Sequence, residues 1–121
     1  MDDLVVWLRA QLDEDERIAR AATLGPWVQS GVGDYGWTVD FGRPGAGVET
    51  SDTDQGLADA DFIATHNPAR VLREIKAKRA ILRELPVKDW HEPCSPLVQL
   101  VLAHMAAPYN YRPGYRGEWR P

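Results

Sequence analysis

The stretch Ala58–Leu85, ADADFIATHNPARVLREIKAKRAILREL, decides the fold because it holds two helical patterns separated by Asn67-Pro68. Proline has a preset φ and no N–H, so it fits the first turn of a helix, and the preceding asparagine can then act as the N-cap. Apolar residues after this point recur at helical spacing, which predicts an amphipathic helix over 68–85. A shorter helix over about 57–66 precedes the break.

Two more helices are predicted nearer the ends of the chain. Asp2 or Asp3 is expected to cap the first, which extends to about Ala22. Its inner side carries apolar residues at helical spacing: Leu4, Val5, Leu8, Leu12, Ala19 and Ala22. The last helix covers about 96–106, with Ser95-Pro96 as its start. This helix is apolar nearly all round, so we expect it to be the most buried of the four.

Three short segments between the first helix and the central pair have β character. They cover 27–30, 37–41 and 47–50, and their connections are rich in glycine. We therefore predict an α+β fold, with about four helices packed on a small three-stranded antiparallel sheet. The predicted single domain consists of a helix at 1–22, the sheet at 26–50, the broken central helix pair at 57–85, a buried helix at 95–107 and an extended tail at 108–121.

Composition bounds the setting of the protein. The chain has 121 residues, a formal net charge of -4 and one cysteine, which excludes a disulfide within the chain and fits a reducing cytosol. The N-terminus lacks the pattern of a signal peptide, and no apolar run approaches the ~20 residues that span a bilayer. These features predict a cytoplasmic protein without a membrane partner.

Several sequence pieces together resemble a small uncharacterised family of actinobacteria and their phages. The resembling pieces are Met1-Asp2-Asp3-Leu4, the acidic run at 12–17, Gly25-Pro26-Trp27, the segment 66–72, and Tyr109 with the ending at 115–121. The Gly-Pro-Trp turn with a later Phe-Ile and Asn-Pro helix start is also loosely similar to the Ea22-like phage proteins. The family is a domain of unknown function, so the resemblance implies a phage or actinobacterial origin and a cytoplasmic setting, but no reaction.

The sequence departs from this family in two places. Leu24 stands where relatives have proline in a Thr-Pro-Gly-Pro-Trp turn. Many relatives also carry additional cysteines ahead of the position that matches Cys94, and this chain has none. The resemblance therefore implies no zinc site in this member.

Three features suggest chemistry that the residues support only weakly. His91, Cys94 and His104 include a His-x-x-Cys spacing, but a structural zinc site needs four ligands, so we predict no metal and no cofactor. The run at 13–16 is acidic, but consecutive helix residues diverge and form a solvated face. The segment Gly31–Gly36 reads G-x-G-x-x-G, yet a strand rather than a helix follows it, which favours a hairpin loop over a nucleotide site.

A basic face on the central helix is the best supported candidate site. Six basic residues and two acidic residues between Pro68 and Leu85 give a local charge of +4 on an acidic chain. Either these charges pair with the acidic first helix, or they form a docking face for an acidic protein or, less expected, a nucleic acid. The candidate residues on this face are Arg70, Arg73, Lys76, Arg79 and Arg83.

The tail contributes three more candidate binding residues. Tyr115, Arg116 and Trp119 have the composition of an interaction hot spot, although they are equally suited to anchoring the tail on the body. We therefore predict a small non-enzymatic binding or adaptor protein of phage or host-regulatory type, with a protein partner. The alternative is a small-ligand-binding protein or compact enzyme that uses the Gly31–Gly36 loop and neighbouring aromatic residues.

Overall fold

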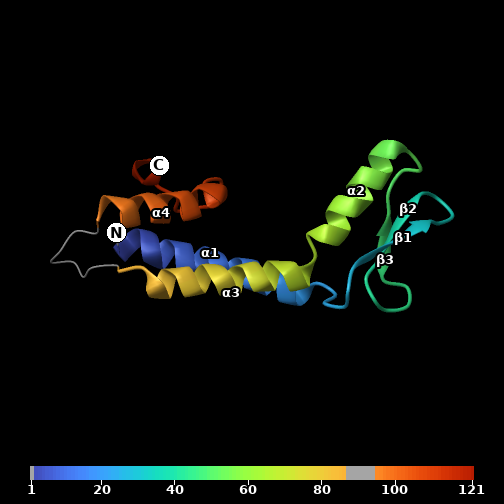
Figure 1. Ribbon diagram of the computed structural model, residues 1–121, viewed down its shortest axis with the longest axis horizontal. Helices are drawn as coiled ribbons and strands as arrows, with labels where there is room; N and C mark the ends of the chain where they lie inside the picture. Colours follow the sequence, from blue (N-terminus) through green and yellow to red (C-terminus); the bar gives the residue numbers. More distant parts are fainter. Residues whose placement is uncertain (1, 87–94) are drawn as a thin grey trace. The chain divides into compact units, whose positions relative to one another are not determined.

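The computed structural model describes residues 2–86 and 95–121, which form four α-helices and one antiparallel sheet (Figure 1). This architecture confirms the α+β prediction. The helices are α1 (Asp2–Ala21), α2 (Asp54–Thr65), α3 (Pro68–Glu84) and α4 (Pro96–Ala106). The strands are β1 (Val28–Val32), β2 (Trp37–Asp40) and β3 (Gly47–Glu49), and two 3-10 turns follow α4, η1 (Ala107–Tyr109) and η2 (Gly117–Trp119).

The chain divides into two compact units, which we name by their main content. The helical unit comprises Met1–Glu14 and Lys76–Pro121, and the sheet unit comprises Asp15–Ile75. Both boundaries fall inside helices, so α1 and α3 each contribute residues to both units.

The helical unit is built on the antiparallel pair formed by the first part of α1 and the last part of α3. Asp13, late in this part of α1, meets Arg79, while Arg9, one turn earlier, lines the same groove as Arg83, one turn later in α3. The core of this unit consists of buried apolar side chains from three helices and the first 3-10 turn: Leu4, Val5, Leu8, Leu12, Leu82, Val98, Leu102, Ala103, Ala106 and Tyr109. The spacing of the leucines in α1 places them on one side of the helix, as their sequence pattern predicts.

Helix α4 has the largest buried fraction of the four helices, as the sequence predicts. Its bounds agree with the prediction, and Ser95 caps it by accepting a hydrogen bond from the N–H of Val98. However, Leu97 is 70% exposed and Leu100 is 47% exposed, so α4 is not buried all round. Only one side of α4, which carries Val98 and Leu102, packs into the core. A helix at the edge of so small a unit has too few neighbours to cover its whole circumference.

The sheet unit contains a three-stranded meander in the order β1-β2-β3, with both pairs antiparallel. Helix α2 packs on β1 and β2, and Val39 in the central strand is 1% exposed beneath it. Gln29 Nε2 donates a hydrogen bond of 3.3 Å to Asp61 Oδ1, which links β1 to α2. On the opposite face of the sheet Val28, Ser30 and Asp40 are exposed, and we call it the open face.

Strand β1 extends two residues beyond the predicted end. The register of β1 on β2 shifts between Gln29 and Val32, and Gly31 in this irregularity has a φ of +94°. A bulge of this kind adds a residue to one strand, so the strict alternation used to predict strand ends is lost.

The helix starts around the central break follow the chemistry of their capping residues. Asn67 Oδ1 accepts a hydrogen bond of 2.9 Å from the N–H of Arg70, which confirms the predicted N-cap of α3. Helix α2 begins at Asp54, earlier than predicted, because Thr53 caps it by accepting from the N–H of Gly56. Gly56 lies in the first turn of α2, and because glycine has a low helix propensity the predicted start was too late.

Candidate functional site

Some basic residues of α3 have a partner within the chain, and others have none among the described residues. Arg70 pairs with Glu74 one turn later on the same helix, with an Nε–Oε1 distance of 3.0 Å. Arg79 Nη2 lies 2.7 Å from Asp13 Oδ1, and the ammonium of Lys78 lies 5.7 Å from the centre of the Tyr109 ring. Three of the six cations therefore have partners within the chain.

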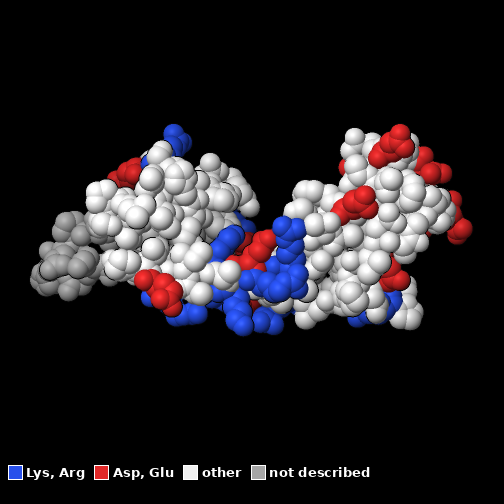
Figure 2. Space-filling view, in the orientation of Figure 1, with Lys and Arg blue, Asp and Glu red and all other residues white. Residues whose placement is uncertain are grey.

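The other three cations of α3 are free to meet a ligand. Arg73, Lys76 and Arg83 are exposed, and none of them forms an ion pair with a described residue. Figure 2 shows Lys and Arg side chains gathered over α1 and α3, with acidic side chains among them. The sequence left open whether the basic residues of α3 pair with the acidic run of α1 or bind a partner. The structure shows that this pairing is only partial.

A groove between α1 and α3 is the best defined feature of this surface. It has a volume of about 280 Å³ and is lined by Arg9, Asp13, Arg79, Leu82 and Arg83. We call it the basic groove. Three arginines and one aspartate give it a formal charge of +2, and the buried Leu82 is its apolar component.

Arg9 is the member of the basic groove that the sequence analysis missed as a site residue. Arg9 forms no ion pair with a described residue. The spacing of Arg9 and Asp13 on one face of α1 matches that of Arg79 and Arg83 on α3. This double i,i+4 pattern could have indicated Arg9 as a site residue, but only if the pairing of α1 with α3 had been known.

The three tail candidates gather around Trp7 of α1. The ring centres of Tyr115 and Trp119 lie 5.5 and 5.4 Å from that of Trp7, and their own centres are 5.9 Å apart. The indole N–H of Trp7 donates a hydrogen bond of 3.0 Å to the carbonyl oxygen of Pro113. Arg116 lies 5.1 Å from the Trp119 ring centre and 3.1 Å from Asp3 Oδ2. These residues therefore attach the tail to α1.

The Gly31–Gly36 segment forms the end of the β1–β2 hairpin. Strand β2 follows it, and the N–H of Gly33 donates a hydrogen bond of 2.7 Å to the carbonyl oxygen of Gly36. A dinucleotide motif requires a helix N-terminus at this point. The structure therefore supports the interpretation as a hairpin loop.

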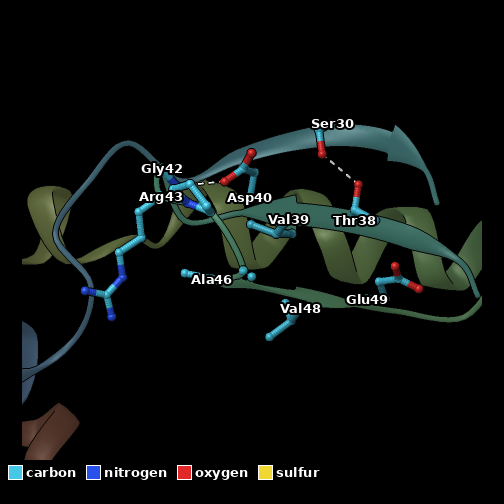
Figure 3. A pocket seen from close by; sticks show the side chains of 12 residues that line it. Ser30, Thr38, Val39, Asp40, Gly42, Arg43, Ala46, Val48 and Glu49 are labelled. Atoms are coloured by element: carbon cyan, nitrogen blue, oxygen red, sulfur yellow. Dashed lines mark hydrogen bonds between the residues drawn. The ribbon is translucent and has the colours of Figure 1, made fainter. Parts of the chain in front are cut away.

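The open face of the sheet carries a larger hollow, of about 700 Å³, lined by residues of all three strands and of the β2–β3 turn (Figure 3). Several of its polar side chains already form hydrogen bonds within the sheet unit. The hydroxyls of Ser30 and Thr38 lie 2.7 Å apart, Asp40 Oδ1 accepts from the N–H of Gly42, and Glu49 Oε2 accepts from the N–H of Tyr35. Because these bonds hold the two turns of the meander, we favour the smaller basic groove as the functional site.

The weak metal set lies largely outside the described residues. This holds for His91 and Cys94, while His104 is an exposed residue of α4. Within residues 2–86 and 95–121, no group of three or more His, Cys, Asp and Glu side chains is arranged to hold a metal ion. In the same part of the chain, no helix combines the length and apolar character required to cross a membrane.

The chain belongs to a known sequence family. It matches DUF6221, a family of unknown function, over residues 1–121. No curated protein and no solved structure matches it. The family assignment therefore names no reaction, and the function has to be inferred from the surface.

Proposed function

We propose that the protein is a small non-enzymatic binding or adaptor protein that docks an acidic segment of a partner protein. The proposed docking surface lies in the helical unit and consists of the basic groove together with Lys76, one turn before Arg79 on α3. The observation that carries the proposal is that Arg9, Lys76 and Arg83 are exposed cations without an ion-pair partner among the described residues. A chain of net charge -4 that leaves these cations unneutralised favours an external anion.

Magnitudes indicate what kind of binding this surface supports. An exposed ion pair contributes about 0.2–1 kcal/mol, so a few such contacts give weak binding on their own. Charges of this type chiefly raise the association rate and select the partner by its sign. We therefore expect weak, salt-sensitive binding of a simple acidic peptide, and tighter binding by a partner that adds apolar contacts.

Other candidate residues extend this proposal. Arg70 and Arg73 precede Lys76 on α3 and belong to the sheet unit, and Arg73 resembles Lys76 in being exposed and unpaired among the described residues. Tyr115 and Trp119 are half-buried rather than buried, so part of each ring is left for a partner beside Arg116. We propose Tyr115, Arg116 and Trp119 as additional contacts of the helical unit, and Arg70 and Arg73 as separate contacts made by the sheet unit.

We also propose a cytoplasmic setting of phage or host-regulatory type. Its support is the sequence resemblance to proteins of actinobacteria and their phages, carried mainly by the Gly25-Pro26-Trp27 turn and the segment 66–72. Immunodetection in separated cytosolic, membrane and secreted fractions of an expressing actinobacterium tests it. Recovery in the secreted fraction would overturn it.

Fluorescence anisotropy with labelled peptides tests the docking proposal. A polyglutamate peptide should bind, a polylysine peptide of equal length should not, and the Lys76→Glu/Arg83→Glu variant should weaken polyglutamate binding by at least roughly tenfold. Arg43→Glu is the matched control, because Arg43 is an exposed arginine of the sheet unit.

Two results would contradict the proposal. Equal binding of polyglutamate by the wild type and the Lys76→Glu/Arg83→Glu variant would place the contact elsewhere. Tighter binding of a DNA or RNA oligonucleotide than of polyglutamate would replace the protein partner with a nucleic acid.

A further inference from the structure

We propose that the basic groove binds a phosphate monoester group, and that this group is a phosphorylated serine or threonine side chain of the partner. The inference rests on the proposed docking of an acidic segment and identifies what the groove recognises within it. It is carried by the arrangement of three guanidinium groups in one small groove.

The two walls of the groove offer different kinds of arginine. Arg9 on α1 and Arg83 on α3 line the groove without an ion-pair partner among the described residues. Arg79 is less exposed than they are, and its ion pair with Asp13, at 2.7 Å, holds it in place. The groove therefore combines one positioned guanidinium with two whose donors are available.

The charge of the groove matches a dianion. Arg9 and Arg83 line the groove from opposite walls, and neither forms an ion pair with a described residue. A phosphate monoester has a charge of about -1.5 to -2 at neutral pH and three acceptor oxygens, enough to bond both guanidinium forks. A single carboxylate has one charge and two oxygens, so it satisfies only one of these arginines at a time. Asp13 does not cancel the preference, since its carboxylate is engaged by Arg79.

The groove is small. Its volume of about 280 Å³ lies at the lower end of the roughly 300–1,000 Å³ of pockets that enclose small molecules. A phosphorylated side chain can enter such a groove while its peptide backbone stays outside. The exposed Lys76, on the same face of α3, is then available to acidic residues that flank the phosphorylated position.

The test compares three labelled peptides by fluorescence anisotropy. All are short and glutamate-rich, and at the central position they carry serine, phosphoserine or two glutamates, the last as a charge-matched control. We expect the phosphoserine peptide to bind the wild type on the order of tenfold more tightly than the charge-matched peptide, because guanidinium forks bond phosphate bidentately. Equal affinity for these two peptides would overturn the inference.

Variants separate recognition of phosphate from attraction by charge. Arg9→Lys/Arg83→Lys keeps the charge and removes the forks, so the ratio of the two affinities should fall to about one while the charge-matched peptide still binds. Lys76→Ala should weaken the binding of both peptides equally, and Arg43→Ala should leave both affinities unchanged. A ratio that survives the double lysine substitution would overturn the inference while leaving the docking proposal intact. Failure of all peptides to bind would overturn both.

Discussion

Asn67 joins two helices through one side chain. Its Oδ1 accepts from the N–H of Arg70 at the start of α3, and its Nδ2 donates to the carbonyl oxygen of Ala64 in the last turn of α2. Asn67→Ala removes both bonds and should lower the free energy of unfolding by ~1 kcal/mol, the usual loss for an N-cap. Urea denaturation measures this change. Asn67→Asp retains the cap acceptor and should lose less, whereas an unchanged midpoint for the alanine variant would show that the cap does not stabilise the protein.

Gly114 sets the approach of the tail to Trp7. Its φ is +87°, and a Cβ added at this position would lie 2.8 Å from Trp7 Nε1. Gly114→Ala should therefore destabilise the helical unit by about 1–3 kcal/mol, through backbone strain and displacement of the indole. Gly117→Ala is the matched control in the same tail, because a Cβ there meets no atom within 4 Å. Equal melting temperatures for the two variants would contradict the observed tail geometry.

At the scale of the elements, local chemistry determined which boundaries could be predicted. Helices α3 and α4 begin at a proline that follows a capping residue, so their starts were predicted correctly at Pro68 and Pro96. The end of β1 was wrong because the bulge near Gly31 depends on pairing with β2. The exposure of Leu97 and Leu100 in α4 could not be predicted, because composition does not reveal how many neighbours a helix has.

The candidate site was predictable only where it lies on one helix. The spacing of Lys76, Arg79 and Arg83 is visible in the sequence and places them on one face of α3. The contribution of Arg9 and Asp13 depends on the pairing of α1 with α3, between residues separated by 66 positions in the chain. Such a contact follows from tertiary packing and has no local signature.

The tail contains only short 3-10 turns among its described residues, so its position depends on aromatic contacts. Besides the rings around Trp7, the guanidinium of Arg112 lies 4.8 Å from the Tyr109 ring centre and donates to the carbonyl oxygen of Gln11. Ending the chain after Pro108 removes the buried Tyr109 and uncovers Trp7, and each large side chain contributes about 1.5–3 kcal/mol when fully buried. We expect a lower melting temperature and increased binding of a hydrophobic dye. A truncated protein as stable as the full chain would show that the tail has no structural role.

At the scale of the whole molecule, charge is segregated along the chain. Residues 27–66 carry seven acidic side chains and one basic side chain, whereas residues 67–86 carry six basic and two acidic ones. An acidic partner is therefore attracted to the basic surface and repelled by the acidic residues elsewhere in the chain. Raising the salt concentration should weaken polyglutamate binding mainly by slowing association, because exposed charges are screened beyond about 10 Å at 0.1 M salt. Stopped-flow measurement over a salt series checks this, and a salt-independent association rate would contradict it.

Mapping polyglutamate binding by NMR tests most directly whether the basic surface of the helical unit is the functional one. Backbone amide and arginine Nε–H signals of the full chain would be followed during titration with the unlabelled peptide. We expect the largest shifts at Arg9, Lys76, Arg79 and Arg83, with small shifts in β1, β2 and β3. Largest shifts in the sheet unit, or no shifts at peptide concentrations where anisotropy reports binding, would contradict the assignment of function to this surface.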